Sequence, residues 1–158
     1  DATVKACMAA AIDANPFFPP PDGAEIDFVL EGLGEWPLEL WVAYQEDAPV
    51  GYVLLQPDLG AAVRRAGGGR NPAWRAWLHW RKERPTDAGR IVLGGVLPAW
   101  RRHGIGRRLW QQALERGRAQ GWHRLTIGPV DVNSSAAAFL QEMNATARQH
   151  YGLYAADV

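Results

Sequence analysis

The stretch that decides the fold reads Val96-Leu97-Pro98-Ala99-Trp100-Arg101-Arg102-His103-Gly104-Ile105-Gly106-Arg107-Arg108-Leu109-Trp110. An apolar, partly β-branched run at 91–97 leads into it and predicts a buried strand. Apolar residues then recur at helical spacing and predict a helix over 104–117; they are Ile105, Leu109, Trp110, Ala113 and Leu114. The chain therefore passes from a strand through a glycine-containing turn into a helix.

This order of elements builds a site for a phosphate group. The first N–H groups of a helix have no partner within it, and the helix dipole favours a negative charge at that end. Gly104 and Gly106 carry no Cβ, so a ligand can approach the backbone closely. Positive charge around the turn comes from four arginines, Arg101, Arg102, Arg107 and Arg108. An ordinary tight turn with a solvated basic face is the alternative. The Rossmann fingerprint is excluded because Leu109 stands where it needs a third glycine.

The pattern Arg101-x-x-Gly104-x-Gly106, after a strand that ends Val-x-Pro, resembles the acyl-CoA signature of the GCN5-related N-acetyltransferase (GNAT) superfamily. In that family the backbone amides of the signature hold the CoA pyrophosphate. The resemblance implies an α/β (α+β) fold with a central mixed, mostly antiparallel sheet flanked by helices. It implies that strands 91–97 and 124–130, the family's fourth and fifth, splay apart to admit the pantetheine arm. The implied CoA-binding residues here are Gly95, Val96, Arg101, Arg102, His103, Gly104, Ile105, Gly106 and Arg107.

Composition is consistent with one domain over residues 1–158. The chain has 158 residues, is 47% hydrophobic, and carries 17 basic and 17 acidic side chains, so its total charge attracts neither nucleic acid nor a membrane. Cys7 is the single cysteine, which excludes an intrachain disulfide and argues against a metal site. There is no signal peptide and no apolar run long enough to span a bilayer, so we expect a cytoplasmic protein.

The N-terminal half predicts two helices and a hairpin. The first helix covers 2–14 and ends at prolines; Asp22 caps the second, whose apolar stripe is Ile26, Val29, Leu30 and Leu33. Between them, Phe17 and Phe18 either line the acceptor site, as the resemblance implies, or fill the core. Alternating apolar runs at 38–44 and 50–55 predict a β-hairpin.

Residues 58–89 are interpreted as an insertion, because the family has a short connection at this point. Its glycine-rich first half predicts a flexible segment, and Pro72 opens a short helix. Trp74, Trp77 and Trp80 share one side of that helix. They either pack against the domain's own core, cover the acceptor site, or form a self-association surface, so a homodimer is compatible with the sequence.

The C-terminal part predicts a helix that Gly117 interrupts and Gly121 follows, then a strand through Leu125, Ile127 and Val130, and a helix over 133–143 capped by Asn133 or Ser134. Asn133 and Ala136 match the family's Asn-x-x-Ala pattern, which extends the implied CoA site to them. Residues 147–158 have room for one final strand. The family's usual first strand and second closing strand are expected to be missing.

The resemblance implies catalysis by direct transfer, but two usual groups are replaced. Leu140 stands at the family's tyrosine position, and Gly128 at the glutamate position of some relatives. Tyr151, Tyr154 or a water would then protonate the thiolate, and Asp131 or a water chain would act as base, unless Asp131 only caps the next helix. A strand amide near Val96 would stabilise the oxyanion.

The predicted function is therefore an acetyl-CoA-dependent N-acetyltransferase that moves an acyl group to an amine of a small molecule or peptide in a ternary complex. The alternative is a non-catalytic acyl-CoA-binding or regulatory module, because Leu140 and Gly128 replace the usual groups. Nucleic-acid binding through the arginines is a third possibility, disfavoured by the zero net charge. The sequence does not define the acceptor, the acyl length or the oligomeric state.

Overall fold

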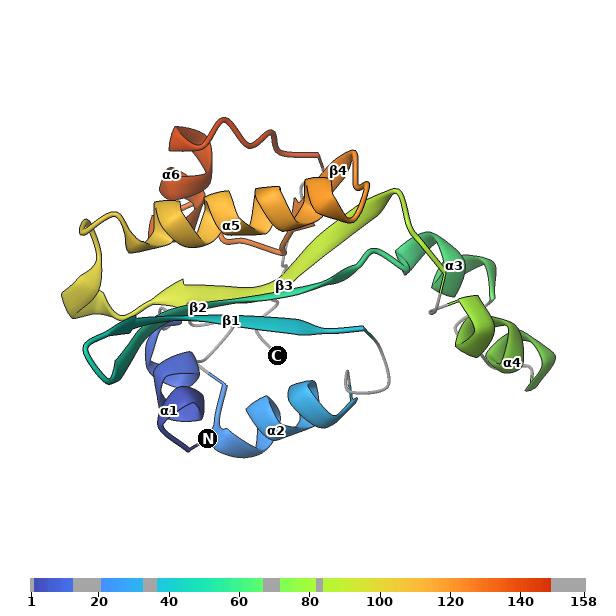
Figure 1. The fold of residues 1–158 in the computed structure, drawn as a ribbon, viewed down its shortest axis with the longest axis horizontal. Coiled ribbons are helices and arrows are strands. Elements are labelled where there is room, and N and C mark those ends of the chain that lie inside the picture. Colours follow the sequence, from blue (N-terminus) through green and yellow to red (C-terminus); the bar gives the residue numbers. More distant parts are fainter. Residues whose placement is uncertain (1, 13–20, 33–36, 67–71, 82–83, 149–158) are drawn as a thin grey trace, which may run out of the picture. The chain divides into compact units, whose positions relative to one another are not determined.

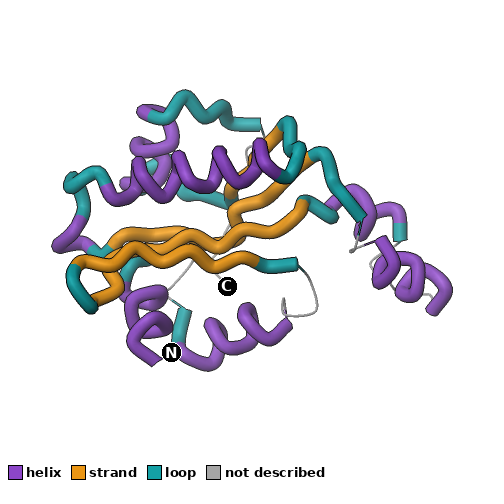
Figure 2. Tube along the Cα trace, viewed as in Figure 1, coloured by secondary structure: helices purple, strands orange, loops and turns teal. Residues whose placement is uncertain are grey.

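The computed structural model describes residues 2–12, 21–32, 37–66, 72–81 and 84–148. The elements in these ranges are, in chain order, α1 Ala2–Ala10, α2 Gly23–Gly32, β1 Glu39–Gln45, β2 Ala48–Pro57, α3 Gly60–Arg65, α4 Pro72–Arg81, β3 Ala88–Val96, a 3-10 helix Pro98–Trp100, α5 Ile105–Ala119, β4 Arg124–Ile127 and α6 Ser135–Glu142 (Figures 1 and 2). The chain divides into two compact units, Asp1–Gly128 and Pro129–Val158. All described strands belong to the first unit, and α6 belongs to the second.

The first unit is built on a mixed, mostly antiparallel sheet in the order β1-β2-β3-β4. β2 pairs antiparallel with β1 and with β3, whereas β4 runs parallel to β3. The predicted fold class is confirmed. So is the hairpin, in which Glu46 turns the chain from β1 to β2 at a φ of 53°.

Helices cover both faces of this sheet. Successive residues of β2 point to opposite faces and supply apolar side chains for helices to pack on at each. Tyr52 packs with α1 and α2 in a cluster that includes Met8 and Ile26. The next residue, Val53, packs on the other face in a cluster that includes Ala113 of α5. Figure 1 shows α1 and α2 on one side of the strands and α5 on the other.

The second helix begins as its sequence predicts. Asp22 Oδ1 accepts a hydrogen bond from Glu25 N at 2.8 Å, and Glu25 Oε2 accepts one from Asp22 N at 3.0 Å. This reciprocal arrangement is a capping box with Asp in place of Ser or Thr. It places Ile26, which is 1% exposed, against the sheet.

One prediction about α5 is wrong and another is confirmed. The helix is not interrupted at Gly117 but continues to Ala119, and Gly121 follows its end as predicted, at a φ of 76°. Trp122 N donates to Gly117 O at 2.8 Å, and Gly121 N donates to Arg118 O at 3.0 Å, the two bonds of a Schellman motif. The Trp122 indole packs against Gly117, with its Cε3 atom 3.2 Å from where a Cβ would lie, so a side chain at position 117 would crowd the ring.

The other boundaries also shift. The first helix ends at Ala10 rather than at residue 14, and β4 ends at Ile127, so Val130 is not part of the strand. Residues 17, 18, 33, 151 and 154 lie outside the described ranges, as does most of the segment for which a final strand is predicted. No strand precedes α1 in the described part of the chain.

The connection between β2 and β3 contains two helices, α3 and α4. The prediction of a flexible first half is wrong at its start, because α3 forms there, with its first amide, Gly60 N, bound to Asp58 Oδ1 at 2.9 Å. The remaining glycines of that prediction, Gly67 to Gly69, lie outside the described residues. The predicted tryptophan helix is confirmed as α4. Burial of its tryptophans in the core is not, since Trp74 is 40% exposed and Trp80 is 51% exposed. No helix among the described residues is long and apolar enough to cross a membrane.

Candidate functional site

The turn between β3 and α5 is attached to the sheet by backbone bonds. Leu97 N donates to Val50 O of β2 at 2.9 Å, and Trp100 N donates back to Leu97 O at 2.8 Å. Gly51 of β2 pairs with Val96, directly before this turn. A Cβ there would be 3.2 Å from Val96 Cγ2 and 3.3 Å from Ile105 Cγ2, so the missing side chain lets α5 begin close to β2.

The turn enters α5 through two residues in the left-handed region, Arg102 at a φ of 65° and Gly104 at 79°. Gly104 is the N-cap, and no side chain caps the helix. A Cβ on Gly104 would meet nothing within 4 Å, so glycine is needed there for its backbone angle and not for space.

The amides at the start of α5 are available to a ligand. The first helical bond runs from Arg108 N to Gly104 O at 3.0 Å. The N–H groups of Gly104, Ile105, Gly106 and Arg107 therefore have no carbonyl partner within the helix. They lie at the positive end of a helix of 15 residues, which is where an anion is stabilised.

The arginines of the turn have two different roles. The Arg101 guanidinium is half-buried and donates from Nε to Val96 O at 3.0 Å and from Nη2 to Ala11 O at 3.3 Å. It therefore holds the turn to the end of β3 and to the end of the first helix. Arg102, Arg107 and Arg108 are exposed and supply the positive charge around the free amides.

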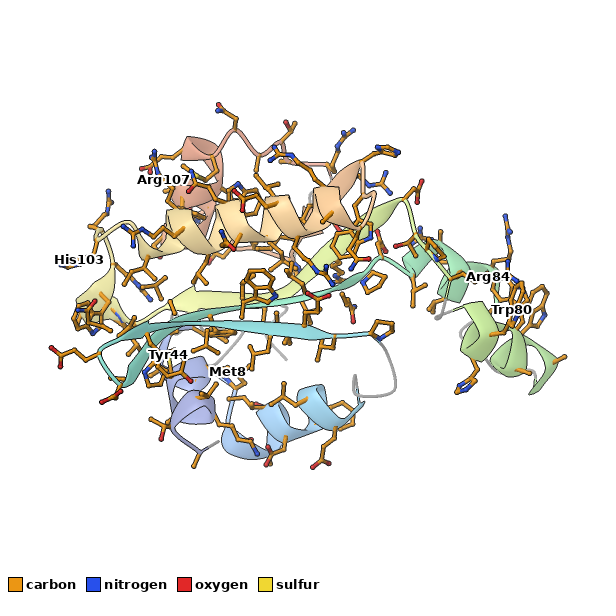
Figure 3. All side chains as sticks on the ribbon, in the orientation of Figure 1. Met8, Tyr44, Trp80, Arg84, His103 and Arg107 are labelled. Atoms are coloured by element: carbon orange, nitrogen blue, oxygen red, sulfur yellow. The ribbon has the colours of Figure 1, made fainter. Side chains whose placement is uncertain are left out.

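His103 lies at the surface of the same turn. Its Nδ1 is 2.8 Å from Arg101 O, which accepts a hydrogen bond when the Nδ1–H tautomer is present. Its ring is 5.8 Å from that of Trp100. Figure 3 shows His103 on the loop before α5 and Arg107 in the first turn of the helix. The structure thus brings together the predicted residues from Gly95 to Arg107.

The end of β3 directs an amide away from its paired strand. Because Leu97 bonds to Val50, the antiparallel ladder leaves the neighbouring pair of Val96 and Gly51 without mutual bonds. Val96 therefore points its N–H and C=O away from β2, and its C=O is the group that accepts from Arg101. The Val96 amide is directed to the side of β3 on which β4 lies.

The pairing of β3 with β4 covers only part of β3. Ala88 to Ile91 pair with Arg124 to Ile127, and β4 then ends. Gly128 turns the chain at a φ of 131°, and Arg90 Nη2 donates to Gly128 O at 3.0 Å. No described residue of β4 pairs with 92–96. The splay of the two strands itself stays a prediction.

One glycine of β3, Gly95, lets the backbone of another element approach the strand closely. A Cβ on Gly95 would lie 2.8 Å from Ala11 O, so this glycine allows the end of the first helix to reach the sheet. β3 also carries a bulge, since the register with β2 shifts between Leu54, which pairs with Leu93, and Leu55, which pairs with Ile91. The residue between them, Val92, has no partner in β2.

In the second unit, Asp131 organises the turn before α6. Its Oδ1 accepts from Asn133 N at 2.9 Å, and its carbonyl accepts from Ser134 Oγ at 2.6 Å. Ser134 is the N-cap, with Oγ accepting from Ala137 N at 3.2 Å. Ser134, and not Asn133, is therefore the helix cap. Asn133 and Ala136 are exposed at the start of α6, and Leu140 is half-buried within it.

Two titrating groups of the first unit are perturbed by burial. Desolvation raises the pKa of the Cys7 thiol and that of the Tyr52 phenol, which is 1% exposed and whose hydroxyl has no hydrogen-bond partner. Neither group is poised to react near neutral pH. No cluster of three or more His, Cys, Asp or Glu that could hold a metal occurs in the described part of the chain.

Residues 7–145 match the acetyltransferase (GNAT) family. The chain belongs to the GNAT family. This GNAT chain is 30% identical over 139 residues to the mycothiol acetyltransferase of Gordonia bronchialis, a match that covers 87% of this chain and 42% of that protein. The chain thus spans less than half the length of this curated relative.

Solved structures share the GNAT fold. The apo aminoglycoside 6'-N-acetyltransferase from Acinetobacter haemolyticus superposes with a TM-score of 0.62 and 13% identity, covering 100% of this chain and 94% of that one. The aminoglycoside N-acetyltransferase AAC(6')-Iy, in complex with a bisubstrate analogue of CoA and acetylneamine, gives a TM-score of 0.55 and 14% identity, over 87% and 82% of the two chains. At these identities the likeness shows the fold alone. The GNAT family uses acetyl-CoA.

Proposed function

We propose that this chain is an acetyl-CoA-dependent N-acetyltransferase that transfers an acyl group directly to the amine of a small molecule or peptide. The observation that carries the proposal is the set of unpartnered amides from Gly104 to Arg107, at the start of α5, in a member of the GNAT family. Such amides bind a diphosphate without any side-chain rearrangement. We place the protein in the cytoplasm.

The CoA diphosphate would lie at these amides, with Arg102 and Arg107 neutralising its charge and His103 at the rim of the turn. Arg101 would act through its bonds to Val96 and Ala11, by holding the turn in place. The pantetheine arm would pass Gly95 and Val96. Asn133 and Ala136, at the start of α6, stay predicted CoA-binding residues on the strength of the Asn-x-x-Ala pattern alone.

The Val96 amide is proposed to stabilise the oxyanion, because it points away from β2 and so is not used in the ladder. The amine would attack the thioester carbon, the C–S bond would break, and the thiolate would leave with a proton. Cys7 is buried with a raised pKa, which is consistent with transfer without a covalent enzyme intermediate.

The hydrogen bond that Asp131 accepts bears on which groups transfer protons. Its carboxylate is bound to the Asn133 amide, which favours a structural part in the turn and leaves water as the base. Tyr151 remains the proposed acid, and Phe17 and Phe18 the proposed acceptor contacts; all three lie outside the described residues.

The relatives support a proposal for the acceptor class. The solved neighbours include aminoglycoside acetyltransferases, and the curated relative is a mycothiol acetyltransferase. We propose a small-molecule polar amine of this kind. The test has two parts: thermal unfolding with and without CoA, and release of free thiol from acetyl-CoA with a panel of such amines.

A non-catalytic acyl-CoA-binding module is the second candidate, because Leu140 supplies no hydroxyl to the site. Both candidates predict a higher Tm with CoA. Thiol release that depends on an added amine supports the enzyme. Protection by CoA without any amine-dependent release supports the binding module, and no protection contradicts both.

A further inference from the structure

The two helices between β2 and β3 concentrate positive charge. Residues 60–84 contain seven of the chain's 17 basic residues and one of its 17 acidic residues. The zero total charge, from which we expected no membrane partner, therefore combines a strongly basic insertion with an acidic remainder. Among the described side chains of the insertion, Arg64, Arg65 and Arg84 are exposed.

The same helices expose large apolar side chains. Trp74 and Trp80 of α4 are 40% and 51% exposed, and Val63 of α3 is 38% exposed. Trp74, Trp77 and Trp80 follow one another at a spacing of three and share one side of α4, whereas His79 lies on the opposite side. The described core clusters on both faces of the sheet do not include them. Among the described side chains, the tryptophans of α4 are therefore not part of the core of the domain.

The arrangement of the rings indicates which anionic partner fits. The Arg84 guanidinium lies over the Trp80 ring, 3.8 Å from its centroid (Figure 3). Trp74 meets Trp77 edge to face, with ring centroids 5.6 Å apart. Stacking of nucleic-acid bases needs open ring faces, and these are partly covered. A bilayer interface instead takes indole rings at the headgroup level with guanidinium groups beside them at the phosphates.

The surface is far from the proposed CoA site. The insertion leaves β2 at Pro57 and enters β3 at Ala88, whereas the CoA turn follows Val96 at the other end of β3 (Figure 1). A strand of this length spans about 30 Å. Both surfaces can therefore be occupied at once.

We propose that α4 and α3 bind the chain to the surface of an anionic bilayer. Trp74, Trp77 and Trp80 enter the boundary between headgroups and acyl chains, and Arg64, Arg65 and Arg84 contact lipid phosphates. A helix of this kind lies in the plane of the interface and does not span it. The proposal does not depend on the chain being an active acetyltransferase.

The test is flotation of the full chain with two kinds of vesicle, phosphatidylcholine alone and phosphatidylcholine with about 30 mol% phosphatidylserine. We expect the chain to float with the anionic vesicles only, and less as salt is added. Arg64→Gln with Arg65→Gln should weaken partitioning roughly fivefold for each charge removed. Trp74→Ala with Trp80→Ala should weaken it about tenfold or more.

Matched controls change exposed residues outside the insertion. Phe28→Ala removes an aromatic ring that is 76% exposed on α2, and Arg124→Gln removes an exposed charge on β4. Both should float like the parent chain. Urea unfolding shows whether each variant is folded, and the arginine variant keeps the test valid if the tryptophan variant is not.

Several results would contradict the proposal. No flotation with anionic vesicles, equal binding to neutral vesicles, or equal losses in the controls would overturn the proposal. Dimerisation without lipid that Trp74→Ala with Trp80→Ala abolishes would assign the surface to a second copy. Salt-dependent RNA binding that the same variants lose, without flotation, would assign it to nucleic acid.

Discussion

Two connections join β3 at its opposite ends, and both contain arginine and tryptophan side chains. The turn into α5 exposes backbone amides, with Gly104 and Arg102 in left-handed conformations. The insertion before β3 exposes indole rings, and the first amide of its helix α3 is already bound to Asp58 Oδ1. The same residue types therefore point to different ligands: free N–H groups with arginines favour a compact phosphate, whereas exposed tryptophans with arginines favour an extended anionic surface.

Gly104→Glu should give the largest effect and separate the two connections. A carboxylate at the N-cap repels the diphosphate, so we expect CoA affinity to fall about 100-fold or more, while vesicle flotation is unchanged. Gly104→Ala is the control, because it introduces the same backbone strain at a φ of 79° without charge. Calorimetric titration with CoA measures both. Equal affinities for the Glu and Ala variants would mean that no anion binds at this turn.

Arg101→Gln tests whether the arginines within the turn differ among themselves. Loss of the bonds to Val96 O and Ala11 O should lower the free energy of unfolding by about 1.5–3 kcal/mol. Arg102→Gln, at an exposed neighbour, should change it by less than about 0.5 kcal/mol. Urea unfolding gives both values. If the two variants are equally stable, Arg101 is not the structural arginine of the turn.

Arg107→Gln should reduce CoA affinity roughly fivefold, because one exposed charge near the diphosphate contributes about 1 kcal/mol. The loss should shrink as salt is added. Arg118→Gln, in the last turn of the same helix, is the control and should leave the affinity unchanged. A loss that salt does not alter would indicate a packing role for Arg107.

Glu39→Gln gives the smallest expected effect and concerns the end of the sheet from which the insertion leaves. Arg116 Nε donates to Glu39 Oε1 at 3.0 Å and to Oε2 at 2.8 Å, and these bonds lower the pKa of Glu39 below its ordinary value of 4.5. The ionised carboxylate therefore stabilises the fold fully above pH 4.5. This contribution is lost as the pH falls through the lowered pKa.

Urea midpoints of the parent chain and of Glu39→Gln should accordingly differ at neutral pH and converge in acid below pH 4.5. A difference that is constant over this range would show that Arg116 does not bind the ionised carboxylate. Such a result would leave Glu39 available to the basic insertion and would weaken the contrast between the two connections.

The parts of the fold that follow local rules were predicted from sequence. The hairpin, the Asp22 cap and the helix after Gly104 each rest on alternation, capping or helical spacing, which neighbouring residues determine. The glycine-containing turn before α5 was predicted for the same reason, and its binding of a phosphate group stays a prediction. What failed depends on packing: Gly117 was predicted to interrupt the helix, but the helix continues there because the Trp122 indole packs where a side chain at position 117 would lie.

The role of Arg101 was missed on similar grounds. Its acceptor Ala11 O lies 90 residues earlier in the chain, and no local pattern indicates that contact. The exposure of Trp74 and Trp80 was likewise not predictable, because a tryptophan stripe at helical spacing looks the same whether its partner is the core or another body. The net charge of zero did not indicate the basic insertion, because a net charge does not say where in the chain the charges lie.

Trp122 lies between Gly89 and Gly117, and a Cβ on Gly89 would stand 2.0 Å from its Cε3 atom. The indole works as a wedge that fastens the far end of α5 to the first residues of β3. Because that end of α5 is packed against β3, the helix has little freedom to rotate about it. The amides at its opposite end therefore keep a fixed direction. Sequence change at these three sites should therefore be concerted, with a side chain at 89 or 117 accepted only where position 122 has become smaller.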